Sequence, residues 1–128
     1  MTDQAAWIDV VHRLVDRVMV GGDFEELEAI ATPGFAAGAR RWIEPFRQSF
    51  PDVRMEIVET VADGSTVVAR LRCSGTQLGS WRGHPPTGRR FSDIDEVYFF
   101  RFEGDRLAGA WGVEDNLTRF RQLGIHEL

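Results

Sequence analysis

The sequence predicts an α+β fold in which N-terminal helices pack on one face of an antiparallel sheet. Three observations support this prediction. Apolar residues in the first 50 positions recur every three or four residues, as on the buried side of helices. Much of the segment 53–113 alternates with the period of two that is typical of strands, and glycine-containing turns separate its strand-like parts. Helices that precede the strands favour segregated layers over alternating βαβ units.

Two helices are expected in the first 30 residues. The segment 3–19 carries a single apolar stripe, and Gly21 and Gly22 end it. Asp23 and Glu26 have the spacing of a capping box, which indicates that a short second helix begins there. The segment 31–38, with one proline and two glycines, is expected to be a loop.

Two further helices are expected, one before the strands and one after them. The apolar side chains of the third helix share one side: Trp42, Ile43, Phe46 and Phe50. Pro51 ends this helix, and Pro45 is expected either to kink it or to mark its first turn. The last helix is short, with Asp115 as its N-cap and Gly124 at its end.

Four sequential antiparallel strands are expected between these helices. The segments 53–62 and 66–75 flank Asp63-Gly64-Ser65, which is a hairpin signal. The segments 89–103 and 106–113 flank a turn around Gly104.

Composition indicates one domain and disfavours several kinds of partner. A chain of 128 residues with 43% apolar residues is expected to form a single domain, residues 1–128, around one core. The net charge of −5 disfavours nucleic acid and anionic membranes, since both require clustered positive charge. No apolar segment is long enough for a membrane span or a signal peptide, so we expect a cytoplasmic location.

No cofactor or metal is expected. Cys73 is the single cysteine, and the three histidines, His12, His84 and His126, lack metal-ligand spacing. No Gly-rich phosphate loop and no Gly-x-Ser-x-Gly motif occurs. All fifteen cationic residues are arginine, which removes Schiff-base catalysis by lysine and hints at a GC-rich bacterial genome.

Glu96 is the first candidate catalytic residue. Alternate positions of its strand form the more apolar face: Ser92, Ile94, Glu96, Tyr98, Phe100 and Phe102. A carboxylate desolvated on that face would have a raised pKa, as a general acid or base near neutral pH requires. The alternative is a structural ion pair with an arginine such as Arg70 or Arg72.

Tyr98 and Asp115 are the other candidate catalytic residues. The Tyr98 hydroxyl can donate a hydrogen bond to a carbonyl oxygen on which charge develops, although tyrosine is also a common strand residue. The favoured role of Asp115 is that of a helix N-cap, and the alternative is an acid of the pocket. The neighbouring Glu114 is a less favoured candidate for that acid.

Several short motifs between about residues 38 and 125 match a known family: Phe50-Pro51-Asp52, Gly75-Thr76, Pro86-Thr87-Gly88, Arg101-Phe102 with Gly104, Trp111 with Asp115, and Gln122-Leu123-Gly124. With these motifs the chain resembles the SnoaL-like polyketide cyclase, or ester cyclase, family of the nuclear-transport-factor-2-like superfamily. The resemblance implies a cone-shaped α+β barrel, a strongly curved sheet wrapped on helices around a deep apolar pocket, often dimeric through the outer face of the sheet. It also implies ring closure in aromatic polyketides by aldol chemistry, while relatives open epoxides, isomerise steroids or assist hydroxylation.

The chain departs from this family pattern at its catalytic positions. The resemblance places the usual general acid/base aspartate at the position of Gly112, and family histidines at the positions of Ala110, Gln77 and Tyr98. We therefore expect catalysis that relies on folding of the substrate, with weak acid/base help from Glu96 and Tyr98.

The pocket wall is expected to combine aromatic surfaces with small residues that leave space. Trp81 and Trp111 can pack a planar ligand, the face with Ala110 and Gly112 leaves volume, and His84 lies at the expected mouth. The full set of expected substrate-binding residues is Trp7, Leu14, Phe46, Leu71, Trp81, His84, Phe100, Ala110, Trp111 and Gly112.

These observations favour a cofactor-independent cyclase of secondary metabolism, such as antibiotic biosynthesis, acting on a hydrophobic polyketide-type intermediate. The alternatives are a non-catalytic binder of an apolar small molecule, an isomerase or epoxide-opening enzyme of the same superfamily, and a structural dimerisation module. Val97 and Phe99 on the outer face of the long strand predict a homodimer.

Overall fold

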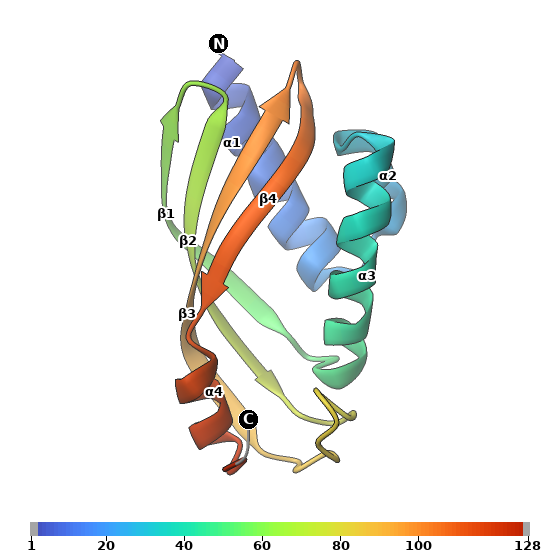
Figure 1. Ribbon diagram of the computed structural model, residues 1–128, viewed down its shortest axis with the longest axis vertical. Helices are drawn as coiled ribbons and strands as arrows, with labels where there is room; N and C mark the ends of the chain where they lie inside the picture. The colour runs from blue at the N-terminus through green and yellow to red at the C-terminus, as the bar shows by residue number, and fades with distance from the viewer. Residues whose placement is uncertain (1–2, 127–128) are drawn as a thin grey trace.

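Helices come first along the chain and strands follow them in the computed structural model, which describes residues 3–126 (Figure 1). The helical elements are α1 (Asp3–Arg13), a π-helical continuation of it, η1 (Leu14–Val20), then α2 (Phe24–Ile30), α3 (Pro33–Ser49) and, after the sheet, α4 (Asn116–Gln122). The strands are β1 (Arg54–Asp63), β2 (Thr66–Thr76), β3 (Arg90–Glu103) and β4 (Arg106–Glu114). The predicted α+β class is confirmed, with one curved antiparallel sheet in the order β1-β2-β3-β4.

The helix starts follow from local capping. The carboxylate of Asp23 accepts a hydrogen bond from the backbone N–H of Glu26 at 3.1 Å, which confirms the predicted start of α2. The loop predicted for residues 31–38 is wrong from Pro33 onward. The Thr32 hydroxyl caps the N–H of Phe35 at 3.3 Å, and Pro33 occupies the first turn, where its missing N–H costs nothing.

The prediction of a loop overestimated how strongly two glycines oppose a helix. Gly34 and Gly38 lie inside α3, which compensates for them by burying Ala36, Ala39 and Ile43. Because α3 begins at Pro33, Pro45 lies deep inside the helix and does not mark its first turn.

Three β-bulges shape the sheet. One extra residue lies at Val58 in β1, one near Asp93 in β3 and one at Ala108 in β4, as the shifts in pairing register show. Asp93 has a φ of 55°, and its backbone N–H donates to the Ser74 hydroxyl at 3.0 Å. The bulge near Asp93 reverses the alternation of β3, so that Phe91 and Ile94 both point inward.

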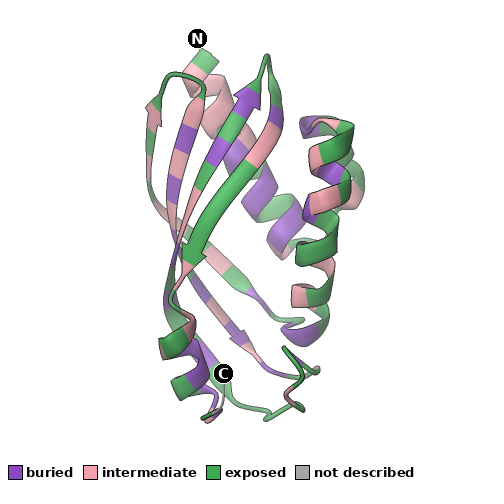
Figure 2. Cartoon of the chain, viewed as in Figure 1, coloured by how far each residue is buried: buried purple, intermediate pink, exposed green. Residues whose placement is uncertain are grey.

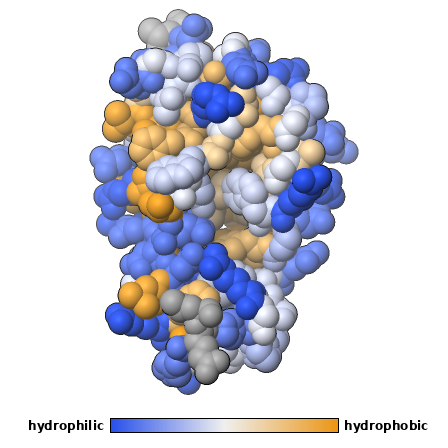
Figure 3. Space-filling view, viewed as in Figure 1, coloured by the Kyte–Doolittle hydropathy of each residue, from blue (hydrophilic) through white to orange (hydrophobic). Residues whose placement is uncertain are grey.

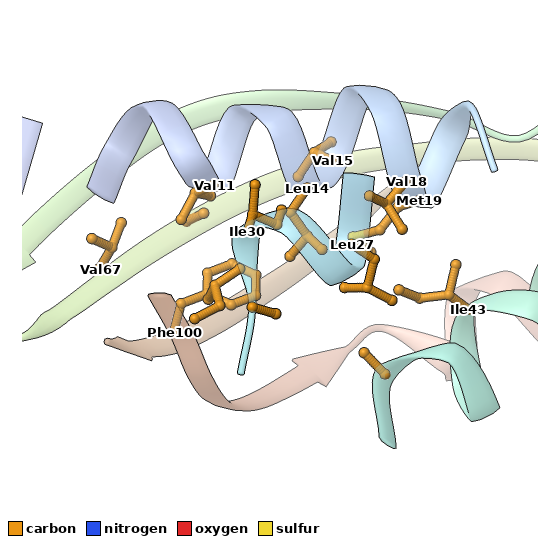
Figure 4. Close-up of a cluster of buried hydrophobic side chains, with 14 of the residues drawn as sticks. Val11, Leu14, Val15, Val18, Met19, Leu27, Ile30, Ile43, Val67 and Phe100 are labelled. Carbon is orange, nitrogen blue, oxygen red and sulfur yellow. The ribbon is translucent and has the colours of Figure 1, made fainter. Parts of the chain in front are cut away.

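The core lies between the helices and the concave face of the sheet. Its larger part joins η1, α2 and α3 to β2 and β3, and Figure 4 shows its side chains: Val11, Leu14, Val15, Val18, Met19, Leu27, Ile30, Ile43, Val67 and Phe100 among them. A second cluster around Phe50, Phe91 and Phe120 packs α4 onto the other end of the sheet. Each such side chain contributes about 1.5–3 kcal/mol by burial.

No helix in the described part of the chain covers the outer face of the sheet. Figure 2 shows buried residues along η1, whose Leu14, Val15, Val18 and Met19 are buried, whereas the lower half of β4 is exposed. Among residues 3–126, no helix combines the length and the apolar character that crossing a membrane requires.

Candidate active site

A cavity of about 630 Å³ opens between α3 and the sheet, a volume within the range of about 300–1,000 Å³ that small-molecule sites occupy. The surface is hollowed at this place between β4 and α3 (Figure 3). Apolar side chains make up most of the wall, which consists of Met19, Trp42, Pro45, Phe46, Gln48, Ser49, Met55, Gly79, Ser80, Trp81, Arg82, Tyr98 and Glu114. Two of these residues, Tyr98 and Glu114, bring acid/base groups to the cavity from the sheet.

The two groups belong to a hydrogen-bonded cluster that continues behind the cavity wall. The Tyr98 hydroxyl donates to Oε1 of Glu96 at 2.8 Å, and its oxygen also lies 3.2 Å from Oε1 of Glu114. Oε2 of Glu96 accepts a hydrogen bond from the guanidinium of Arg119. Glu96 is 0% exposed and is not part of the cavity wall, whereas the side chain of Glu114 is 28% exposed. A ligand in the cavity can therefore touch Tyr98 and Glu114, but it reaches Glu96 only through Tyr98.

Strand pairing explains why these side chains meet. Glu96 pairs with Glu114, and Tyr98 pairs with Gly112, in the antiparallel ladder between β3 and β4. Directly paired residues and residues two positions apart share one face of a sheet. The bulge at Ala108 sets this register, because without the extra residue Glu96 would pair with Val113.

Arg119 reaches the cluster because α4 folds back directly after β4. Asp115 caps the helix by accepting from the Thr118 N–H at 3.1 Å, and its own N–H donates to the Asp95 carbonyl at 3.0 Å. Arg119 is 0% exposed, with its guanidinium 4.7 Å from the centre of the Phe91 ring. The guanidinium also donates to the side-chain oxygen of Asn116. Its two terminal nitrogens thus have oxygen partners inside an aromatic enclosure.

The environment changes the pKa values of these groups. Burial, reinforced by the negative charge of Glu114, raises the pKa of Glu96 to about 7, although Arg119 acts in the opposite direction. Burial and the two carboxylates raise the pKa of Tyr98, so the phenol keeps its proton at neutral pH. Burial lowers the pKa of Arg119, but the carboxylates of Glu96 and Glu114 outweigh that effect and leave it raised. Burial also raises the pKa of Cys73, so this nearby thiol stays neutral.

Gly112 gives Tyr98 its place against the sheet. A Cβ atom at position 112 would lie 2.4 Å from Cδ1 of Tyr98, far inside van der Waals contact. The Tyr98 ring therefore lies over bare backbone of β4. The aspartate that the family resemblance leads one to expect at 112 would displace the phenol.

Gln77 holds the loop that closes one end of the cavity. Its buried side-chain amide donates to the carbonyls of His84 and Pro85 at 3.3 and 3.2 Å, and its carbonyl accepts from the Thr87 hydroxyl at 2.9 Å. Trp81 and His84 exchange two backbone hydrogen bonds, and Trp81 thereby forms part of the wall. At this position, where the resemblance implies a histidine, the residue fastens a loop.

The structure brings some of the expected site residues to the cavity and places others elsewhere. Tyr98, Phe46 and Trp81 line it. Leu14, Leu71 and Phe100 are instead fully buried in the hydrophobic core, because the helices pack closely on the sheet there.

The remaining expected site residues lie outside the cavity wall. Trp7 stacks on Phe102 with ring centres 5.2 Å apart, in a different part of the molecule. His84 contacts Phe120 edge to face. Four residues on and just after β4 are exposed and do not line the cavity: Ala110, Trp111, Gly112 and Asp115.

Trp111 and Asp115 have other structural positions. Trp111 is 64% exposed on the outer face, where it contacts Phe99. Asp115 caps α4, as its favoured interpretation predicted. The arginine partner of Glu96 is also not the one expected, since Arg70 pairs with Glu59 and Asp95 on the exposed side.

Two members of the cluster were missed from the sequence, Glu114 and Arg119. The sequence does contain a signal for Arg119. This residue lies four positions before the buried Leu123, the C-cap of α4, so both fall on the inner side of the helix, where a cation requires a buried partner. Glu114 was recognised only as a neighbour of Asp115.

Fold and site together define a small α+β protein with an apolar ligand cavity and a buried acid/base cluster. The model of the SnoaL-like polyketide cyclase family matches residues 5–123, and the chain belongs to this family. It is 27% identical over 134 residues to aklanonic acid methyl ester cyclase DnrD of Streptomyces peucetius, covering 91% of this chain and 90% of the relative.

Two solved structures share the fold of this chain. TsrD from Streptomyces laurentii superposes with a TM-score of 0.89 at 26% identity, covering 98% of this chain and 100% of TsrD. A SnoaL-like polyketide cyclase from Agrobacterium tumefaciens superposes with a TM-score of 0.77 at 26% identity, covering 92% of this chain and 98% of that structure.

Proposed function

We propose that this protein is a cofactor-independent cyclase that closes a ring in a hydrophobic, polyketide-type intermediate of secondary metabolism. The observation that carries the proposal is the cavity of about 630 Å³ in which a phenol and a carboxyl, Tyr98 and Glu114, stand beside apolar and aromatic side chains. Membership of a polyketide cyclase family supports the reaction class. The relative DnrD, an aklanonic acid methyl ester cyclase by name, supports a ring-closing reaction.

The proposed catalysis combines positioning with modest acid/base assistance. A flexible chain folded against Trp42, Phe46 and Trp81 brings its reacting carbons together. Holding two such groups in the reactive geometry can lower the barrier by about 7–11 kcal/mol. The Tyr98 hydroxyl donates a hydrogen bond to a substrate carbonyl as negative charge develops on its oxygen. Glu96 and Arg119 orient that hydroxyl from behind the wall.

The test compares turnover with binding in Tyr98→Phe. Aklanonic acid methyl ester, the compound in the name of the relative, is the first probe, followed by any small molecule found by native mass spectrometry to co-purify from the native host. A cyclase with this mechanism loses turnover in Tyr98→Phe by about 10²-fold or more while it still binds the product. Full turnover in the variant on an identified substrate would show that the mechanism is wrong.

A non-catalytic small-molecule binder is the second candidate. It is favoured by the full burial of Glu96, which leaves Tyr98 and Glu114 as the acid/base groups that the sheet presents on the described cavity wall. A binder shows no conversion of any retained ligand, and Tyr98→Phe then changes affinity only.

We also propose a homodimer formed through the outer face of the sheet. An apolar row crosses all four strands there at paired positions, Val61, Val68, Phe99 and Trp111, and Val113 lies beside it. Phe99 and Trp111 are 43% and 64% exposed in the single chain. A second copy would cover this row. A cytoplasmic location stays a prediction.

A further inference from the structure

We propose that Glu96 and Glu114 share one proton across the Tyr98 hydroxyl, and that Glu114 is the member of this pair that exchanges it with a ligand in the cavity. The proton sharing stands on geometry alone. The exchange with a reacting ligand rests on the proposed cyclase function.

The Tyr98 hydroxyl has fewer hydrogens than its two carboxylate contacts require. A phenol has one O–H and can donate one hydrogen bond, yet the Tyr98 oxygen lies 2.8 Å from Glu96 and 3.2 Å from Glu114. If both carboxylates were ionised, one of these two contacts would bring lone pairs together with no proton between them. One added proton resolves the conflict, because either carboxyl can donate to the phenol oxygen while the phenol donates to the other.

The charges of the cluster also favour one added proton. Arg119 is the cation that contacts the cluster, with its guanidinium bonded to Glu96 and 3.8 Å from Glu114. If both carboxylates were ionised, the cluster would carry a net negative charge although Glu96 and Arg119 are fully buried. One shared proton makes the cluster neutral.

The elements packed around the cluster supply no second cation among the described residues that contact it. From β2, Cys73 contributes a neutral thiol, and from α4, Asn116 contributes an amide oxygen that accepts from Arg119. On the cavity wall, α3 presents Trp42 and Phe46, and the guanidinium of Arg82 lies over the Trp81 ring at 5.1 Å. Near neutral pH the raised pKa of Glu96 agrees with one proton held by the pair.

Glu96 and Glu114 differ in their access to the cavity. Glu96 is sealed from the cavity, whereas Glu114 lies on its wall with 28% of its side chain exposed. A proton can therefore leave or enter the pair at Glu114, and Tyr98 connects that carboxyl to the buried one.

The shared proton gives a balanced cycle for an intramolecular addition. The Glu114 carboxylate takes a proton from a substrate carbon, and the electron pair of that C–H bond forms the new C–C bond to a carbonyl carbon. The carbonyl oxygen takes the Tyr98 proton, and Tyr98 regains one from protonated Glu96. One proton has moved from carbon to oxygen, and the cluster keeps its own. Transfer from Glu114 through Tyr98 to Glu96 restores the starting state.

Infrared titration of the ligand-free protein tests the sharing without any substrate. The wild type is expected to show one protonated carboxyl between about pH 5.5 and 7, identified by glutamate ¹³C labelling. Glu96→Gln is expected to lose this band at pH 7, because it removes the buried carboxyl. Glu114→Gln is expected to move the disappearance of the band to lower pH, because the burial of Glu96 persists while the like charge of Glu114 is gone. Glu103→Gln, an exposed position on β3, is the matched control and keeps the band unchanged.

Two results would overturn the sharing: no protonated carboxyl in the wild type at pH 6, or a band whose titration is unchanged in either of the two cluster variants. Tyr98 is the only tyrosine, so its ¹³Cζ resonance gives a second readout of the same hydrogen bonds. That resonance is expected to shift in both cluster variants and to stay in place in Glu103→Gln. An unchanged resonance in either cluster variant counts against the shared proton.

Turnover tests the role of Glu114 as the exchanging group. On an identified substrate, Glu114→Gln is expected to lose about 10²- to 10⁴-fold in kcat, the usual contribution of a general acid or base. If the infrared result holds but no conversion is found, the proposed function fails and the shared proton stands. If conversion is found without the infrared signature, or is unaffected by Glu114→Gln, this inference fails alone.

Discussion

Replacement of Arg119 by methionine removes the positive charge on which the buried cluster depends. Arg119 and Glu96 are each 0% exposed, so neither charge can be compensated by water. Methionine keeps much of the aliphatic volume inside the enclosure that includes Phe91, but it leaves Glu96 without its cationic partner. Breaking a buried pair in this way costs about 3–5 kcal/mol, and we expect Arg119→Met to lower the free energy of unfolding by about that amount at pH 8.

The expected loss depends on pH with a definite sign. The pKa of Glu96 is raised from 4.5 to about 7 in the folded protein, so the fold favours the protonated form of this carboxyl. The stability that protonated Glu96 contributes to the fold is complete below about pH 4.5 and is lost as the pH rises through 7. Without the charge of Arg119 the folded pKa rises further, and the loss extends to higher pH. Arg119→Met is therefore expected to be much less destabilising at pH 5 than at pH 8.

Equilibrium urea unfolding at pH 5 and pH 8 measures both effects. The matched control is Arg40→Met, which removes an exposed ion pair with Glu44 at 3.0 Å and is expected to cost less than about 1 kcal/mol. Equal m-values would show that the variants unfold from comparably compact states. The electrostatic account is refuted if Arg119→Met costs no more than Arg40→Met at pH 8, or if its cost is the same at both pH values.

Two further predictions concern Gly112 and the outer face. In Gly112→Ala, the added Cβ would lie 2.4 Å from Tyr98, so the ¹³Cζ resonance of that tyrosine should shift and turnover should fall at least about 10-fold, the cost of roughly 1.4 kcal/mol. Gly38→Ala, where nothing lies within 4 Å, is the control, and an unmoved Tyr98 resonance in Gly112→Ala would contradict the prediction. Sedimentation should show a dimer at micromolar concentration that Phe99→Ser with Trp111→Ser converts to a monomer. Leu78→Ser changes a similarly exposed apolar residue in a loop and should leave the dimer intact. A monomeric wild type would exclude the proposed homodimer.

The elements that local chemistry determines could be predicted from the sequence. The cap at Asp23 marked the start of α2, and strand alternation placed Glu96 among apolar side chains. The start of α3 was missed because its stability comes from tertiary burial of Ala36 and Ile43, which outweighs the weak helix propensity of its glycines.

The partners of Glu96 could not be predicted, because they depend on non-local geometry. Arg119 follows it by 23 residues and meets it only because α4 turns back over the end of β3. Whether Glu114 or Val113 faces Glu96 is decided by a single extra residue, Ala108, in the bulge of β4. A pattern of alternating residues does not reveal where such a bulge lies, and a shift of one residue exchanges the two faces of a strand.

The same register explains how a chain with glycine at the expected acid position can still present a carboxyl to its cavity. Positions 112 and 114 are two residues apart on β4 and share one face, so Glu114 lies one inward position beyond the site where the resemblance places the aspartate. Gly112 opens the space that the Tyr98 ring fills, and the phenol then reaches Glu114. We infer that glycine at 112, tyrosine at 98 and glutamate at 114 function as one unit. Introducing aspartate at 112 alone would therefore displace Tyr98 rather than restore a family-type acid.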